Sequence, residues 1–374
     1  MTLRSNWAYF EAEISGRSTA DFLRSSTAVD AIARLTRPRA HATATNIQAA
    51  LMRTRDIDVA GLVQQAPRIA LTNTHLASYA GSELWTAEIA RYLSGLGLPL
   101  IVFSPVLGAV SQHLADQGIA VTDDPQALAD FKPDVVHINH YAAVEDALQR
   151  MLTRPRLVNM IHGLLPTPGL PARQGMDRYW SVALHATAKI ELLTPCRWED
   201  VRIIPNYFDE TRFFPRGSQR GKRALLFSSK TTQDQREWLA AALARIGYEL
   251  DHVGYGGVPS SNPAELLSQY ELVFAVARSA IEALACGARV ILWDSGVIGP
   301  LVSEDNFWTC VAANFSMASC VLPYMFLTDI DAADWLATQE KQPAGGVAKL
   351  ADANLRLSNV APLLIEGYSE VLSA

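Results

Sequence analysis

The chain has 374 residues, of which 49% are hydrophobic and 19% are charged, and its formal net charge is −6. This length is sufficient for two domains with buried cores. The acidic balance excludes nucleic-acid binding through a general positive field. No segment reaches the about 18–20 apolar residues that a membrane span needs, so we expect a soluble protein, although peripheral contact with a membrane surface stays open.

Acids and arginines are scattered through residues 1–26, which predicts no secretory signal. The cysteines have no CxxC spacing and no histidines at metal-ligand offsets; they are Cys196, Cys286, Cys310 and Cys320. We therefore expect reduced thiols, no bound metal and a cytoplasmic protein.

Residues 1–66 are rich in Ala, Arg and Thr, with helical patches at 28–35 and 47–52 and no clear strand. We expect a helical N-terminal extension. A solvated extension or an oligomerisation arm is favoured over a catalytic part. The sequence does not determine the oligomeric state.

Residues 67–216 alternate between short apolar runs and amphipathic segments. Strands are expected at 68–72, 100–103, 119–121, 134–138, 157–161, 180–183 and 201–205, with helices at 81–96 and 110–117. Apolar runs separated by helices are typical of a parallel sheet that helices cover on both faces. This pattern predicts an N-terminal Rossmann-like domain.

A polar stretch at 215–222 has the composition of an interdomain linker. The alternation then resumes, with strands expected at 224–228, 248–253, 271–275 and 290–293 and helices at 232–246 and 263–270. Residues 217–345 thus predict a second Rossmann-like domain, and 346–374 predict helices that could pack back on the first. The expected fold class is α/β, with two Rossmann-like domains facing a cleft and a helical extension.

The segment 273–294 contains the most informative pattern. An apolar run is followed by a helix that we expect to start at Ser279 and to end at Gly287, before a second apolar run. The free N–H groups at a helix start favour a phosphate. Arg278 can add a charge-assisted bond, and Glu282 can accept from ribose hydroxyls. Strand, helix start and strand in this order can form half of a nucleotide site.

This segment resembles the donor-sugar motif of GT-B glycosyltransferases, especially the retaining glycosyltransferase family 4, E-x-F-G-x-x-x-x-E-A-M-A-x-G-x-P-V. Residues 282–287, Glu-Ala-Leu-Ala-Cys-Gly, match its right side, whereas the first glutamate of the family falls on Phe274. A phenylalanine cannot accept bonds from sugar hydroxyls, and Phe274 belongs to an apolar run that predicts a strand. The departure implies either a different mode of donor binding or lost activity.

The loop before the first helix, 74–83, resembles the family's G-G-x-E. Ala80 replaces the first glycine and Gly81 retains the second, where a missing side chain lets the backbone approach a phosphate or sugar. Ser82 could equally be a simple helix N-cap. The resemblance implies that Gly81 contacts the donor.

Histidines stand at two later strand ends. His137 lies within a strand that resembles P-D-v-v-H-x-H and is expected in the core, whereas His140 and Tyr141 lie just past the strand end, where we expect acceptor contact. His162-Gly163 resembles t-x-H-G. The resemblance implies that this histidine lies beside the donor sugar and the scissile bond.

Three further segments follow the family's order. Residues 203–215 resemble v-I-P-N-G-V-D-x-x-x-F-x-P, which supports the resemblance more than it suggests chemistry. Lys230 is the best candidate to bind the donor diphosphate, ahead of Arg236. Gly254 and Gly256 resemble the x-G-x-G that lies near the nucleotide.

The resemblance implies a glycosyltransferase that moves a sugar from a UDP-, GDP- or dTDP-sugar to an unidentified glycan, lipid-linked or small-molecule acceptor. Arg278, Ser279 and Lys230 would hold the diphosphate, and His162 and Glu282 would be catalytic. Neither a DxD-like acidic pair in a metal-binding context nor a carboxylate base stands out in the sequence. Retention without a metal or other cofactor is therefore what the resemblance implies.

Two alternatives stay open. A non-catalytic GT-B homologue could act as a binding or regulatory subunit, and a nucleotide-sugar 2-epimerase would release nucleotide without an acceptor. A Rossmann dehydrogenase is disfavoured because no GxGxxG follows the first expected strand.

Overall fold

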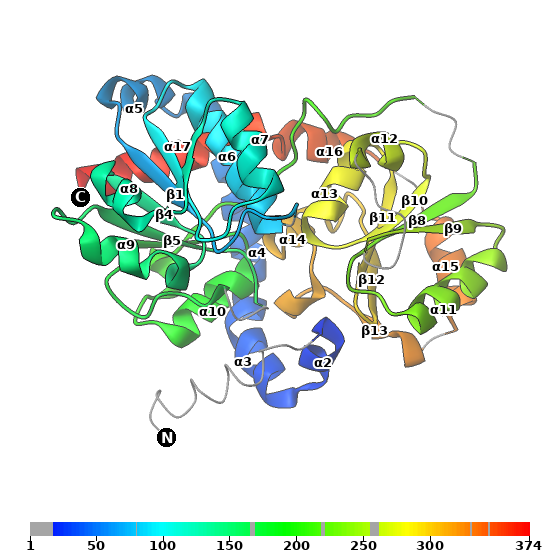
Figure 1. Ribbon diagram of the computed structural model, residues 1–374. Helices are drawn as coiled ribbons and strands as arrows, with labels where there is room; N and C mark the ends of the chain where they lie inside the picture. The colour runs from blue at the N-terminus through cyan, green and yellow to red at the C-terminus, as the bar shows by residue number, and fades with distance from the viewer. Residues whose placement is uncertain are drawn as a thin grey trace. The chain divides into compact units, whose positions relative to one another are not determined.

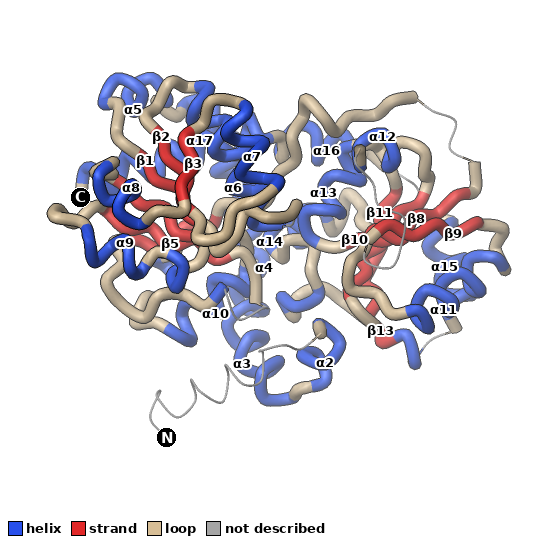
Figure 2. Tube along the Cα trace, viewed as in Figure 1, coloured by secondary structure: helices blue, strands red, loops and turns tan. Residues whose placement is uncertain are grey.

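A computed structural model of the chain describes residues 18–79, 81–164, 169–217, 221–254, 262–329, 331–342 and 345–374. These residues form two compact units. The first unit comprises Ala50–Ile204 and Ala361–Ala374, and the second comprises residues 18–49 and Pro205–Val360. Figures 1 and 2 show that helices and strands alternate along both units.

The first unit is built on a seven-stranded parallel sheet of order β3-β2-β1-β4-β5-β6-β7. Its strands are β1 (Ile69–Thr72), β2 (Leu100–Phe103), β3 (Ala120–Thr122), β4 (Val135–Ile138), β5 (Arg156–Ile161), β6 (Arg178–Ser181) and β7 (Arg202–Ile203). Every residue of β1 and β4 is buried, as expected for strands covered on both faces. The chain adds strands first on one side of β1 and then on the other, so the strand order reverses between β1 and β4.

Helices cover both faces of this sheet (Figure 1). They are α5 (Val59–Gln65), α6 (Gly81–Gly95), α7 (Ala109–Asp116), α8 (Pro125–Asp130), α9 (Glu145–Arg150) and α10 (Leu184–Leu193). On one face, Leu128 of α8 packs in a cluster with Val136 of β4. On the other face, Trp85 of α6 and Tyr368 of α17 (Leu357–Ser373) pack against His137. His137 is buried, so its expected place in the core is confirmed.

The end of the chain contributes to the first unit. Tyr368 shares a hydrogen bond of 2.8 Å with His137 Nδ1. Arg202 of β7 forms ion pairs with Glu366, at 2.8 Å, and with Glu370. These contacts attach the last helix to the sheet through both a buried hydrogen bond and charged groups.

The second unit contains a six-stranded sheet of order β13-β12-β11-β10-β8-β9. Its strands are β8 (Arg223–Phe227), β9 (Glu249–Val253), β10 (Leu272–Ala275), β11 (Arg289–Asp294), β12 (Val297–Leu301) and β13 (Met325–Phe326). Strands β8 to β11 are parallel, and β12 and β13 pair antiparallel at one edge. Here the strand order reverses between β8 and β10.

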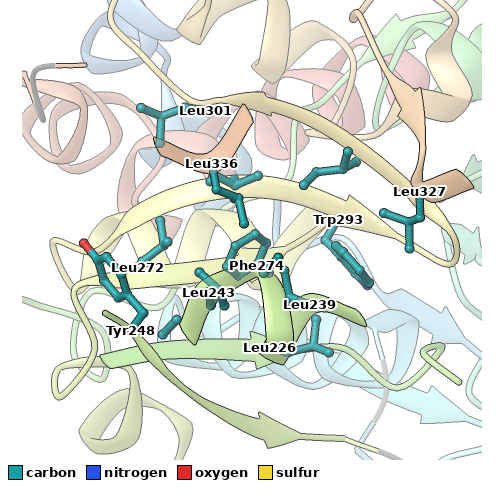
Figure 3. Close-up of a cluster of buried hydrophobic side chains, with 14 residues drawn as sticks. Leu226, Leu239, Leu243, Tyr248, Leu272, Phe274, Trp293, Leu301, Leu327 and Leu336 are labelled. Atoms are coloured by element: carbon teal, nitrogen blue, oxygen red, sulfur yellow. The ribbon is translucent and has the colours of Figure 1, made fainter. Parts of the chain in front are cut away.

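The second core forms on one face of this sheet. Figure 3 shows Phe274 of β10 within a cluster that includes Leu243 and Trp293. Phe274 is 0% exposed, and its ring meets that of Trp293 edge-on with centroids 6.0 Å apart. The position that the family motif assigns to a glutamate is therefore part of the hydrophobic core, as the apolar run predicted.

The remaining helices lie wholly or partly in the second unit. They are α2 (Thr19–Arg24), α3 (Ser26–Thr36), α4 (Ala40–Met52), α11 (Gln233–Ala244), α12 (Pro263–Leu267), α13 (Ala277–Ala285), α14 (Phe307–Ala312), α15 (Ala332–Glu340) and α16 (Val347–Asn354). The unit boundary falls within α4, after Ala49. The described part of the predicted extension, residues 18–66, is thus divided between the two units.

The start of the described chain packs on the second unit. The hydroxyl of Thr19 donates to the Asp294 carboxylate at 2.6 Å. The Arg37 side chain donates to the backbone carbonyl of Cys320 at 3.0 Å. Helices α2 and α3 are therefore held to this unit by hydrogen bonds to residues far along the chain.

Candidate functional site

Polar side chains gather at the carboxyl edge of the first sheet, where its strand order reverses. Open α/β sheets bind ligands beside such a point. Asn73 directly follows β1, Asn139 and His140 follow β4, and His162 follows β5. The structure therefore brings the two predicted histidines to one sheet edge, together with two asparagines that sequence reasoning missed.

The Thr86 hydroxyl on α6 organises these side chains. It donates to a backbone carbonyl one turn earlier at 2.8 Å, and it accepts from the side-chain amides of Asn73 and Asn139 at 3.0 Å each. The two amide oxygens are then available to the imidazoles. Asn73 Oδ1 lies 2.9 Å from His140 Nδ1, and Asn139 Oδ1 lies 2.6 Å from His162 Nε2.

These contacts determine which ring nitrogen carries the proton. An amide oxygen only accepts, so His162 Nε2 is a donor. The Thr74 N–H approaches His140 Nδ1 at 3.3 Å, but it makes a shorter contact of 2.8 Å with Asn73 Oδ1, which favours His140 Nδ1 as a donor to Asn73 as well. Burial, with repulsion from His75 and Lys189, lowers the pKa of His140 to about 4, and burial lowers the pKa of His162 well below its usual value. Both rings are neutral at pH 7, and each keeps one acceptor nitrogen, Nε2 in His140 and Nδ1 in His162.

Two further predicted residues border this edge. Tyr141 is partly exposed, and burial together with the nearby Glu145 carboxylate raises its pKa. Gly81 is exposed at the start of α6, and a Cβ there would meet nothing within 4 Å, so packing does not require a glycine. Ser82 is not the N-cap, because it lies inside α6 and its hydroxyl donates to Glu83 at 3.1 Å.

In the second unit, the predicted donor residues flank the reversal of strand order between β8 and β10. Lys230 lies shortly after β8 and is exposed, and Arg278 and Ser279 lie in the first turn of α13, directly after β10. Ser279 is partly exposed. This sheet edge thus holds two cationic side chains and the start of a helix.

Helix α13 begins at Ala277, two residues before the predicted start at Ser279. Only Val276 separates it from β10, and Ala277 has a left-handed φ of 53°. The Ala277 N–H donates to the carbonyl of Phe315 at 3.3 Å, so one of the helix-start donors is used within the unit. This tight connection contains no loop that could hold the first glutamate of the family motif.

Arg278 and Glu282 contact each other. They lie one helical turn apart, their side chains are 10% and 8% exposed, and Arg278 Nε donates to Glu282 Oε1 at 2.8 Å. The guanidinium also lies 5.6 Å from the ring centroid of Tyr207. Part of the hydrogen-bonding capacity that was predicted for a phosphate and a ribose is therefore used inside the protein.

Gly254 has a structural reason to be glycine. Its φ is 136°, and a Cβ there would lie 2.1 Å from the Ser228 carbonyl oxygen. The ends of β8 and β9 approach too closely for any side chain. Gly256 lies outside the described residues.

Within the described part of the chain, no group of three or more His, Cys, Asp or Glu residues is arranged to hold a metal ion. Among the described helices, none combines the length and hydropathy needed to cross a membrane.

No protein-family model matches the sequence, and no curated protein is detectably similar to it in sequence. Solved structures are nevertheless similar in fold. A glycosyltransferase from Rickettsia africae has a TM-score of 0.56 at 14% identity, covering 82% of this chain and 99% of its own. Anabaena Alr3699/HepE, in complex with UDP-glucose, has a TM-score of 0.56 at 15% identity, covering 81% of this chain and 100% of its own. The lipopolysaccharide outer core galactosyltransferase WaaB has a TM-score of 0.51 at 10% identity, covering 81% of this chain and 99% of its own.

The chain has the GT-B fold. The expected α/β class with two Rossmann-like sheets is thereby confirmed. At these identities the likeness extends to the fold and not to individual side chains.

Proposed function

We propose that this protein is a glycosyltransferase that moves a sugar from a nucleotide-sugar donor to an acceptor hydroxyl. The observation that carries the proposal is the fold likeness over nearly the whole length of known glycosyltransferases, one of which is bound to UDP-glucose. We further propose a retaining, metal-independent reaction like that of family 4. Polar residues at the reversal points of both sheets support the proposal.

The reaction breaks the bond between the anomeric carbon and the diphosphate oxygen and forms a bond from that carbon to the acceptor oxygen. The acceptor proton passes to the leaving phosphate. In the second unit, the start of α13 with Ser279 and the exposed Lys230 provides positive potential for the diphosphate. Arg278 and Glu282 would act as a pair, because their mutual bond holds both side chains together at the start of α13.

In the first unit, the neutral imidazoles are suited to hydroxyl groups. His162 Nδ1 can accept a hydrogen bond from a sugar hydroxyl, and His140 Nε2 can accept one from the acceptor, with Tyr141 beside it. The Asn73 and Asn139 amides hold the rings in the required tautomers. Gly81 leaves open space in which a substrate can approach the start of α6.

A second candidate function is a non-catalytic GT-B homologue that serves as a binding or regulatory subunit. One observation favours it. Phe274 is buried in β10, and a single residue joins β10 to α13, so the first glutamate of the family motif has no counterpart there. A nucleotide-sugar 2-epimerase is a third possibility, which acceptor dependence separates from the first.

The test is a panel of UDP-, GDP- and dTDP-sugars, screened by thermal shift and then by nucleotide release with and without glycan, lipid-linked and small-molecule acceptors. A donor at a hundredfold excess over its Kd stabilises a protein by about 2.7 kcal/mol. Acceptor-dependent release supports the transferase, and release without an acceptor indicates the epimerase. Binding without release indicates the non-catalytic homologue, and unchanged melting throughout the panel contradicts donor binding.

A further inference from the structure

Lys189 on α10 is a buried lysine beside the polar edge of the first sheet. It is 0% exposed, and its Nζ donates to the carbonyl of Gly163, the residue after His162, at 3.3 Å. Within the described residues no carboxylate offsets its charge, and burial alone lowers its pKa to about 7. Buried lysines are rarely left without a paired charge. The protonated form of this amine therefore requires a negative group that the described residues do not supply.

Two histidines are electrostatically coupled to this amine. His185, one turn earlier on α10, is 2% exposed, and its Nδ1 has no hydrogen-bond partner among the described residues. Burial lowers the pKa of both His185 and His140 to about 4, and positive charge on Lys189 adds to the effect. The start of α10, whose N-cap Ala183 makes no side-chain cap, adds the positive end of the helix dipole. Among the described residues, none of these basic groups has a negatively charged partner.

Glycine backbone covers the amine at two positions. Gly163 accepts its hydrogen bond, and a Cβ added at Gly169 would lie 3.8 Å from the Lys189 Nζ. Both glycines are partly exposed. Among the described residues, an added Cβ at Gly169 would meet no atom within 4 Å except Lys189 Nζ, so there is room for a small group beside the amine at this position.

We propose that Lys189, with His185 and the start of α10, forms an anion subsite that takes the phosphate or carboxylate group of the acceptor. The assignment of this anion to the acceptor rests on the proposed glycosyltransferase function. Anion binding itself does not, because it requires neither a donor nor transfer. An anionic acceptor would supply the negative charge that the described residues lack.

Proton linkage gives the subsite a distinctive property. A bound anion favours the protonated amine and so raises the pKa of Lys189 above about 7. Anion affinity should be greatest below that pH and should fall by up to about tenfold per pH unit above it. The neighbouring elements also bring titratable groups to this edge: His75 after β1, Glu83 on α6, His140 and Tyr141 after β4, His162 after β5 and His185 on α10. The Glu83 carboxylate oxygen Oε1 lies 3.1 Å from His75 Nε2.

Sulfate and acetate are the probes, because neither changes its charge between pH 6.5 and 8.5. Each is titrated calorimetrically into the full chain at both pH values, in two buffers of different ionisation enthalpy. We expect binding with proton uptake that is at least about tenfold tighter at pH 6.5. Preference for sulfate points to a phosphate-bearing acceptor, and preference for acetate points to a carboxylate.

Three variants identify the site. Lys189→Met keeps a long apolar side chain and should abolish both the anion affinity and its pH dependence. Gly169→Ala places a methyl group near the amine without a clash or a positive φ, so it should weaken binding about three- to tenfold while leaving the melting temperature unchanged. Lys132→Met removes an exposed lysine of the same unit and should bind like wild type.

Equal anion affinity in wild type and Lys189→Met overturns the subsite, and so does an equal loss in Lys132→Met. The two proposals can fail separately. If donor screening is negative while sulfate still binds through Lys189, the glycosyltransferase proposal fails and the subsite stands. If the enzyme transfers sugar to neutral acceptors and has no affinity for either anion, the subsite alone fails.

Discussion

At the residue scale, one hydroxyl determines the chemistry of two imidazoles. Thr86 accepts from Asn73 and Asn139, and their amide oxygens then accept from His140 and His162. Burial keeps both rings neutral at pH 7. The first unit therefore presents acceptor nitrogens to a hydroxyl-bearing ligand. The second unit differs, because its two best charged candidates are already bonded to each other.

The Arg278–Glu282 pair gives the first prediction at this scale. Both side chains are about nine-tenths buried, so Glu282→Leu alone leaves a buried guanidinium without its carboxylate. We expect the free energy of unfolding to fall by about 3–5 kcal/mol. The double variant Arg278→Leu/Glu282→Leu should lose less than either single variant. Urea unfolding followed by tryptophan fluorescence measures all three.

The double variant also tests the donor site, because it removes both charges without leaving one unpaired. If it binds nucleotide sugars as tightly as wild type, then Arg278 and Glu282 stabilise α13 and do not contact the donor. If the loss of unfolding free energy in the double variant equals the sum of the losses in the two single variants, the pair has no coupling energy.

At the element scale, the connection from β10 to α13 decides what the second unit can offer a ligand. A single residue, Val276, joins them, and Ala277 must adopt a left-handed backbone to make the turn. The short connection keeps Phe274 inside the strand and its ring inside the core (Figure 3). The family motif therefore continues in Glu282 and Gly287 but lacks its first acid.

This turn yields an element-scale prediction. An L-residue in the left-handed region costs about 1–2 kcal/mol that glycine avoids. Ala277→Gly should therefore raise the free energy of unfolding, by about 0.5–1 kcal/mol after the flexibility of glycine is included. Ala280→Gly, inside the same helix, should lower it by about 1 kcal/mol or more. Chemical denaturation of both variants measures the contrast, and destabilisation by both substitutions would contradict a strained Ala277.

At the scale of the whole molecule, residues far apart in sequence complete each unit. Residues 361–374 contribute Tyr368 to the first unit, and residues 18–49 contribute Thr19 to the second. The Thr19 hydroxyl donates to Asp294 at the end of β11 across 275 positions of sequence. Helices α2 and α3 are thus structural parts of the second unit.

Asp294 supplies the corresponding prediction. Burial raises its pKa, against the opposing effects of Lys230 and Thr19. The folded state therefore holds this proton more tightly than the unfolded chain. The resulting stability is present below the unfolded pKa near 3.8 and is lost as pH rises through the folded value. The asparagine side chain of Asp294→Asn cannot ionise. The free energy of unfolding of this variant should therefore fall less with rising pH, and the variant should be more stable than wild type at pH 7.

Thr19→Val is the control for this prediction. It removes the hydrogen bond to Asp294 and should destabilise the protein by about 1–3 kcal/mol without abolishing the pH dependence. Thermal unfolding between pH 4 and pH 8 measures both variants. An Asp294→Asn protein that is less stable at pH 7, with the wild-type slope, would contradict a protonation cost in the folded state.

The sequence alone determined the parallel strands β1 to β11, their α/β alternation and the positions of the histidines at strand ends, but it did not predict the antiparallel edge strands β12 and β13. Apolar runs such as those of β1 and β4 are strong local signals because both faces of the strands are buried. The same local logic placed Phe274 in a strand, against the family pattern. The Arg278–Glu282 contact also had a local signal, since residues four apart on a helix face each other, but an expected ligand role took precedence over it.

Only the tertiary structure decided which polar groups meet. Three separate segments contribute Asn73, Thr86 and Asn139, and the local sequence of these segments does not predict their shared hydrogen-bond network. Lys189 sits inside a helix whose sequence does not reveal that this amine is buried beside Gly163. The assignment of residues 18–49 to the second unit depends on long-range contacts as well. Local periodicity reports which face of an element is apolar, whereas the partner of a buried polar group is set by the packing of distant segments.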